Sequence, residues 1–167
     1  MLGRLKSMTN SNNKDYEVVA KYIKDISFEI PDPDCFVAAA EKLSEYSTKL
    51  DLSSQPFKNN LIELNCKFVL EAPEHIEKKI YTEICLAIVF KITNLELTSE
   101  QVKKLILVTM PTEHFPFMKE MVTHLFQKSG FKNFSFTKEV DFAELYKQQF
   151  LLQHKRFRNV RFQKLLM

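Results

Sequence analysis

The chain has 167 residues, of which 45% are hydrophobic and 27% charged, and this composition fits one globular domain with a core of its own. It holds only two glycines, so the Gly-rich loops with which nucleotide-binding proteins cradle phosphate are excluded by count. Five of the 24 basic side chains and none of the 21 acidic ones lie in residues 151–167, so residues 1–150 carry 19 basic against 21 acidic side chains, although the whole chain has a net charge of +3.

Three segments follow from this asymmetry and from the hydrophobic pattern. Residues 1–15 are polar over much of their length, and we expect them to be a flexible leader. Residues 16–150 are expected to fold as a single domain. Residues 151–167 form a basic, aromatic tail that could extend the last helix.

The first part of the domain has the period-two pattern of strands. Residues 25–30 alternate apolar and polar side chains and predict a half-buried strand that stops at Pro31 and Pro33. Residues 34–46 are an Ala-rich connector that could hold a short helical turn. Leu50 and Leu52 then predict a second strand that ends near Pro56.

Two further strands are predicted on the same ground. Residues 62–70 alternate clearly, and a turn follows at residues 72–75. The fourth strand, residues 79–90, has one apolar face throughout. Its other face begins polar and becomes apolar from Cys85 onwards, so we expect its second half to be covered on both faces.

The hydrophobic period then changes to that of helices. Thr98 with Gln101 is a capping-box signal, and apolar residues follow at helical spacing until Pro111. A second helix is predicted to begin near Pro116 and to end before Gly130. Asp141 is predicted to start the last helix. Strands followed by helices predict an α+β fold in which helices back a four-stranded antiparallel sheet.

No arrangement of catalytic or metal-ligating residues is evident. The four histidines stand apart in sequence, at His75, His114, His124 and His154. The odd number of cysteines, without a close pair, gives no disulfide framework, and buried inert thiols are the better interpretation of Cys35, Cys66 and Cys85. We therefore expect no enzyme activity, no cofactor and no metal site.

The location follows from the same features. The first residues lack an apolar stretch long enough for a signal peptide, and no run approaches the ~18 apolar residues of a membrane span. We expect a cytoplasmic protein without direct membrane insertion.

Four short motifs resemble those of the SecB family of protein-export chaperones. Residues 22–31 (YIKDISFEIP) resemble the opening strand of that family, and residues 49–52 (KLDL) its second strand. Residues 115–117 (FPF) are similar to its Phe-Pro-Tyr/Phe helix start, and residues 140–146 (VDFAELY) to the signature that opens its last helix. The order and spacing hold over residues 16–150, so the domain is identified as SecB-like.

The resemblance implies a function in binding other polypeptides. Members of the family are tetramers, dimers of dimers, that hold unfolded precursor proteins without ATP and deliver them to the motor ATPase SecA. The resemblance places a motor-docking face at four residues, which the alternation puts on the polar side of their strands: Asp25, Glu29, Tyr81 and Glu83. It implies a homotetramer, which we expect to assemble through the fourth strand and the helix near Thr98.

The chain also departs from the family pattern. It has no Trp, whereas the family usually has one before the second strand, so Tyr46 or Phe36 could take its place in the client groove. The other aromatic residues that we assign to the candidate groove are Phe57, Phe68 and Phe117. Ala87-Ile88 replaces a Gly-Gly pair, and the tail is basic where the family's tail is acidic or polar.

Two alternative functions stay open. One is a related chaperone dedicated to a specific partner, such as a toxin–antitoxin pair. The other is a nucleic-acid-binding protein that uses the tail, where Phe157 and Phe162 interleave with Arg and Lys. The near-neutral body argues against the second alternative, so no nucleic acid is expected as a partner.

Overall fold

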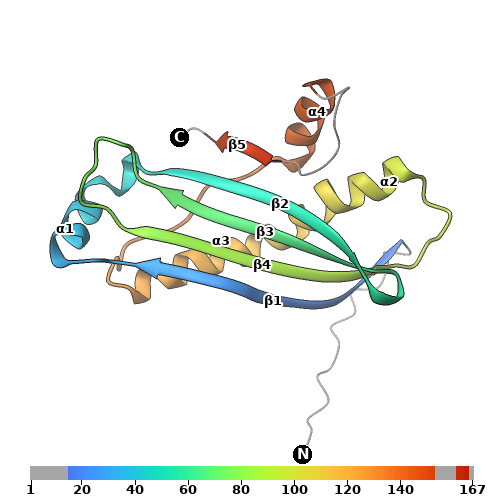
Figure 1. Cartoon of the computed structure of the whole chain (residues 1–167), viewed down its shortest axis with the longest axis horizontal. Helices are drawn as coiled ribbons and strands as arrows, with labels where there is room; N and C mark the ends of the chain where they lie inside the picture. Colours follow the sequence, from blue (N-terminus) through green and yellow to red (C-terminus); the bar gives the residue numbers. More distant parts are fainter. Residues whose placement is uncertain (1–14, 153–160, 166–167) are drawn as a thin grey trace, which may run out of the picture.

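The structure, a computed structural model, describes residues 15–152 and 161–165. Its strands form one antiparallel sheet in the order β1-β4-β3-β2-β5 (Figure 1). The strands are β1 (Tyr16–Glu29), β2 (Ser47–Phe57), β3 (Leu61–Glu71), β4 (Tyr81–Ile92) and β5 (Arg161–Leu165). The helices are α1 (Pro33–Lys42), α2 (Ser99–Lys104), α3 (Met110–Lys128) and α4 (Phe142–Leu152).

The α+β fold class and the four antiparallel strands β1 to β4 are confirmed, and α3 lies along one face of the sheet (Figure 1). In the tail, α4 is described as far as Leu152, and residues 161–165 form β5 beside β2. Residues 1–14 of the predicted leader and residues 153–160 of the tail lie outside the described residues.

The core lies between the sheet and α3, because every second strand residue points to that side. Large apolar side chains of the three central strands are almost fully buried there, among them Leu64, Phe68, Ile84, Leu86, Ile88 and Phe90. From α3, Met118, Val122 and Phe126 close the core. The Phe126 ring stacks on Phe134 with centroids 4.2 Å apart. The Phe-rich link after α3 is thus part of the core.

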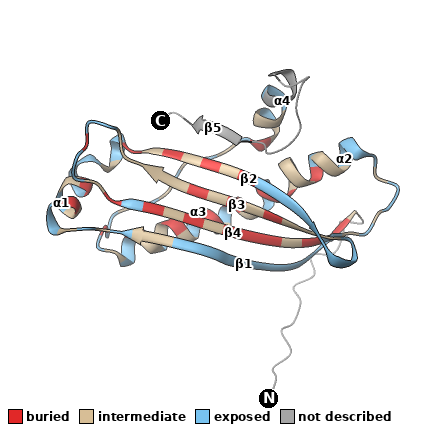
Figure 2. Ribbon diagram, viewed as in Figure 1, coloured by how far each residue is buried: buried red, intermediate tan, exposed pale blue. Residues whose placement is uncertain are grey.

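β1 begins earlier than the predicted strand. The prediction missed its first half because the alternation of apolar and polar residues is interrupted there. Register shifts occur between Val18 and Ala20 and between Ile23 and Asp25, as expected for β-bulges. Each shift inserts one residue, so the period-two pattern is lost over the first half of the strand. β1 is also an edge strand, and Figure 2 shows most of its length as exposed.

Pro111 does not end the first predicted helix, which continues into α3. The five residues Leu105–Thr109 form a π-helical segment (η3), in which the Met110 N–H donates to the Leu105 carbonyl. This wider turn relieves the clash that a proline ring meets with the carbonyl four residues before it. Pro116 likewise lies inside α3 and not at its start. The two predicted helices are therefore one bent helical stretch.

The other helix-end signals are confirmed. Thr98 and Gln101 form a complete capping box at α2. Gly130 follows α3 with φ +107°, and the Phe131 N–H reaches back to the Phe126 carbonyl. The Asp141 carboxylate accepts the Glu144 N–H at 2.9 Å and so caps α4.

Candidate functional site

The four predicted docking residues lie together on the outer face, which we define as the side of the sheet opposite α3. Glu29 pairs with Tyr81 across β1 and β4, and Ser27 pairs with Glu83. Asp25 is two residues from Ser27 and therefore lies diagonally across from Glu83. The structure thus brings Asp25, Glu29, Tyr81 and Glu83 into one contiguous patch, the acidic patch.

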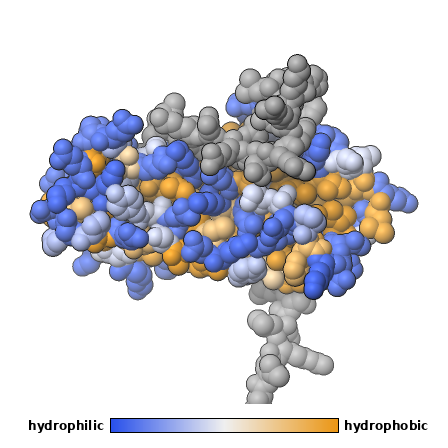
Figure 3. All heavy atoms as spheres, in the orientation of Figure 1, coloured by the Kyte–Doolittle hydropathy of each residue, from blue (hydrophilic) through white to orange (hydrophobic). Residues whose placement is uncertain are grey.

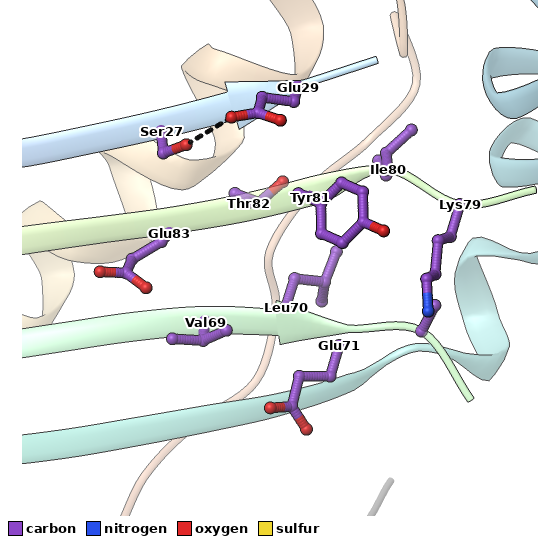
Figure 4. A pocket seen from close by; sticks show the side chains of 11 residues that line it. Ser27, Glu29, Val69, Leu70, Glu71, Lys79, Ile80, Tyr81, Thr82 and Glu83 are labelled. Carbon is purple, nitrogen blue, oxygen red and sulfur yellow. Dashed lines mark hydrogen bonds between the residues drawn. The ribbon is translucent and has the colours of Figure 1, made fainter. Parts of the chain in front are cut away.

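A shallow hollow of about 670 Å³ opens beside this patch. Figure 4 shows Glu29, Tyr81, Glu83 and Glu71 around it, from three neighbouring strands. The Ser27 hydroxyl donates to Glu29 Oε1 at 3.5 Å, and the Tyr81 ring is 49% exposed. Lys79 Nζ of the same chain lies over the Tyr81 ring, 5.9 Å from its centre. The carboxylates of Asp25 and Glu29 beside this exposed ring suit a basic side chain of a partner.

The outer face also carries lysine side chains, which form ion pairs with some of its carboxylates. Lys67 Nζ lies 2.6 Å from Glu83 Oε1, and this hydrogen bond raises the pKa of Lys67. Lys49 pairs with Glu71 at the same distance. Within the described part of the chain, Asp25 and Glu29 form no ion pair. Of the three carboxylates in the acidic patch, Glu83 is thus paired with lysine, whereas Asp25 and Glu29 form no ion pair among the described residues.

Lys49 and Lys67 were visible in the sequence as the polar members of their alternating strands. What sequence could not supply is the register, which sets Lys67 opposite Cys85 and so beside Glu83. A cross-strand ion pair depends on that register as much as on the residue types.

The second half of β4 is buried on its inner face but only partly covered on its outer face, where Cys85 and Val89 are half-buried. On the outer face Ala87 is fully buried between Tyr22 and Asn65 of the neighbouring strands. Glu63 accepts hydrogen bonds there from Lys24 at 2.7 Å, from Gln55 at 2.6 Å and from Tyr22 at 3.1 Å. The Lys24 and Gln55 bonds hold the pKa of Glu63 below its usual value. Side chains of the same chain thus cover part of this face.

The five aromatic residues assigned to the client groove do not form one surface. Phe57 is 60% exposed at the end of β2. Phe36 and Phe117 are half-buried: the Phe36 ring lies 4.9 Å from that of Phe131, and Lys21 Nζ lies 4.1 Å from the centre of the Phe117 ring. Tyr46 and Phe68 are buried. The placement of these two in an open groove is corrected, because both belong to the core of this chain.

Tyr46 has a structural role. Its hydroxyl accepts the Ile80 N–H at 3.3 Å, and burial raises the pKa of the phenol. Sequence reasoning missed most of the open apolar side chains along β1, because that strand is predicted to begin only at Asp25. These side chains, each at least 37% exposed, are Val18, Val19, Tyr22, Ile23 and Ile26. Ile26 lies inside the predicted strand on its apolar side, yet it is 45% exposed.

The described residues hold no group of three His, Cys, Asp or Glu side chains that could bind a metal ion. They contain no helix of the length and apolar character needed to cross a membrane. The three cysteines are free thiols, and burial raises the pKa of Cys66 to about 12. The Cys66 thiol is therefore protonated and unreactive at neutral pH.

Comparisons with known proteins agree with this geometry. A putative protein-export protein SecB of Pelagibacter ubique is 30% identical over 136 residues, which cover 81% of this chain and 97% of the relative. The protein-export protein SecB of Orientia tsutsugamushi (strain Boryong) is 31% identical over 140 residues, 83% of this chain and 85% of the relative.

A solved structure shares the fold. It is a SecB-like chaperone of Mycobacterium tuberculosis in complex with a ChAD peptide from the HigA1 antitoxin. The likeness has a TM-score of 0.54 at 12% identity and covers 75% of this chain and 87% of that one. The family model described as preprotein translocase subunit SecB matches residues 9–153. The chain therefore belongs to the SecB family of protein-export chaperones.

Proposed function

We propose that this chain is a cytoplasmic, ATP-independent chaperone that holds unfolded precursor proteins and delivers them to a SecA-type motor. The observation that carries the proposal is the family match over residues 9–153, which spans strands β1 to β4 and helices α1 to α4. Holding a client requires no chemical step, so the proposal needs no catalytic residue and no cofactor.

Exposed apolar side chains support client binding. Val19, Tyr22 and Ile26 on β1 are 44–56% exposed, and Phe57 is 60% exposed. Figure 3 shows hydrophobic side chains interspersed among hydrophilic ones on the face in view. An unfolded chain offers the same kind of apolar side chains. Several weak apolar contacts on one assembly would hold it with an affinity that no single contact provides.

We propose a homotetramer, a dimer of dimers, as the active form. The support is the edge strand β1, whose apolar side chains and open backbone edge are suited to cover by another chain. Glu63 and its partners cover part of the outer face of β4 within one chain, so β4 supports the assembly that we expected there less than β1 does.

The acidic patch is the proposed docking face for the motor. Asp25 and Glu29 are exposed without an ion pair among the described residues, and Tyr81 is 49% exposed beside them. A motor surface that carries Arg or Lys would bind here with an affinity that falls as salt is added.

A second candidate function is a chaperone dedicated to one partner. It is favoured by the shared fold with the Mycobacterium tuberculosis SecB-like chaperone, whose solved structure holds an antitoxin peptide. A dedicated chaperone would protect one partner and leave unrelated unfolded proteins to aggregate.

The test is the turbidity of a chemically unfolded precursor that is diluted into buffer with stoichiometric protein and no nucleotide. We expect turbidity to be suppressed for several unrelated precursors. Suppression for one partner alone would favour the dedicated chaperone, and unchanged turbidity for all would refute both functions.

A further inference from the structure

The tail supplies a fifth strand to a sheet that would otherwise end at β2. β5 lies antiparallel to β2, with Leu165 opposite Thr48, Phe162 opposite Leu50 and Arg161 opposite Asp51. Figure 1 shows it along the outer edge of β2. Without β5, the outward N–H and C=O groups of β2 would form an open edge, which is the usual acceptor for an extended peptide.

This strand comes from outside the family-matched region. The family model ends at residue 153, whereas β5 begins at Arg161. The segment that contains it, residues 151–167, has five basic and no acidic side chains, unlike the rest of the chain. The covered edge therefore lies within the family-matched domain, and the cover comes from residues outside the match.

The cover is also partial. β5 is five residues long, and its pairing is irregular between Thr48 and Leu50. β2 continues to Phe57, and residues 53–57 are all exposed. No other described strand pairs with β2 beyond Asp51 on this side. An incoming extended segment can thus pair first with the open end of β2 and then replace β5 one residue at a time.

We infer that β5 is an intramolecular gate on the edge of β2, which an extended client segment must displace in order to add as a strand. The inference rests on the proposed client-holding function and deepens it, because it specifies a client backbone in β conformation at this edge. The occupant in the absence of client is residues 161–165 of the same chain. Only eight residues separate β5 from α4. This short linker gives β5 a high effective concentration at the β2 edge, where it competes with a client segment.

The size of the effect follows from occupancy. If β5 covers the edge for about nine-tenths of the time, the apparent affinity for a competing strand falls about tenfold. The test variant is Phe162→Pro/Gln163→Pro in the full chain. Successive N–H groups of a strand point to opposite sides, so one of the two prolines must remove a hydrogen-bond donor that faces β2. The matched control is Phe162→Val/Gln163→Thr, which keeps two residues that favour strands.

The probe is a fluorescein-labelled synthetic peptide of alternating valine and threonine with glutamates at both ends, measured by anisotropy. We expect the proline variant to bind about tenfold more tightly than the natural chain, and the control variant to bind like the natural chain. The same peptide with N-methylated alternate residues should show no gain, because it cannot complete the ladder of hydrogen bonds. Hydrogen exchange of the amides of residues 47–51 should become faster in the proline variant alone.

Equal affinity of the natural chain and the proline variant would overturn the inference. Weaker binding by the proline variant would also overturn it, since β5 would then be part of the client surface. Unchanged hydrogen exchange would show that β5 does not cover the edge in solution. In each case, suppressed turbidity of unfolded precursors by the same samples would leave the proposed chaperone function intact.

Discussion

The acidic patch gives the sharpest test of motor docking, through the double substitution Asp25→Asn/Glu83→Gln. The change removes one unpaired carboxylate and one that is paired with Lys67 at 2.6 Å. The side chains of Lys67 and Glu83 are 42% and 35% exposed, and an ion pair at that exposure contributes about 0.2–1 kcal/mol. For a domain of this size we expect the melting temperature to fall by about 1–3 °C.

The effect on motor binding should be larger. Each carboxylate that meets a basic side chain of the motor contributes up to about 1 kcal/mol, so losing both weakens the complex by up to roughly thirtyfold. The assay is calorimetry of the chain against the motor at low and at physiological salt. The natural chain should lose affinity as salt rises, and the double variant should lose less.

A matched control variant removes the same number of negative charges from a different part of the surface. Glu41 on α1 and Glu120 on α3 are exposed acidic residues outside the acidic patch, so Glu41→Gln/Glu120→Gln removes the same two charges. We expect this control to bind the motor like the natural chain. Full affinity of Asp25→Asn/Glu83→Gln, or an equal loss in the control, would refute the assignment of the acidic patch.

Three further predictions concern the fold and the assembly. Gly130→Ala should lower the free energy of unfolding by about 1–2 kcal/mol in urea titrations, because φ is +107° and the added Cβ would lie 2.9 Å from Phe36 Cε2. In the same titration, Phe68→Ala should lower the free energy of unfolding by about 3–5 kcal/mol, because Phe68 is buried. Phe57→Ala should change the free energy of unfolding by less than about 0.5 kcal/mol, because Phe57 is exposed, and it should weaken client binding. Light scattering at micromolar concentration should give a mass near four times 19.7 kDa, and a monomer would contradict the proposed tetramer.

Sequence predicted the elements whose signals are local. The strands β2, β3 and β4 follow period-two alternation, and the caps at Thr98, Gly130 and Asp141 are set by residues within one turn of the helix end. The orientation of the acidic patch was predictable for the same reason. Alternation alone decides to which face a strand residue points.

Other features could not be predicted from the local residue pattern. Pro111 was taken to end a helix, but a π-helical segment beside it makes the proline acceptable. The pairing of β5 with β2 joins residues more than a hundred positions apart, and no local pattern encodes it. Tyr46 and Phe68 were assigned to a groove because aromatic residues suit both core and client surface, and only packing separates the two.

The central claim, that this chain binds unfolded polypeptides, is tested most directly by size-exclusion chromatography with light scattering on a mixture of the chain and a precursor, without nucleotide. The account predicts a complex whose mass equals one assembly plus one precursor when the precursor is unfolded. It predicts separate peaks when the same precursor is folded. Separate peaks in both cases, or a complex with the folded form alone, would contradict it.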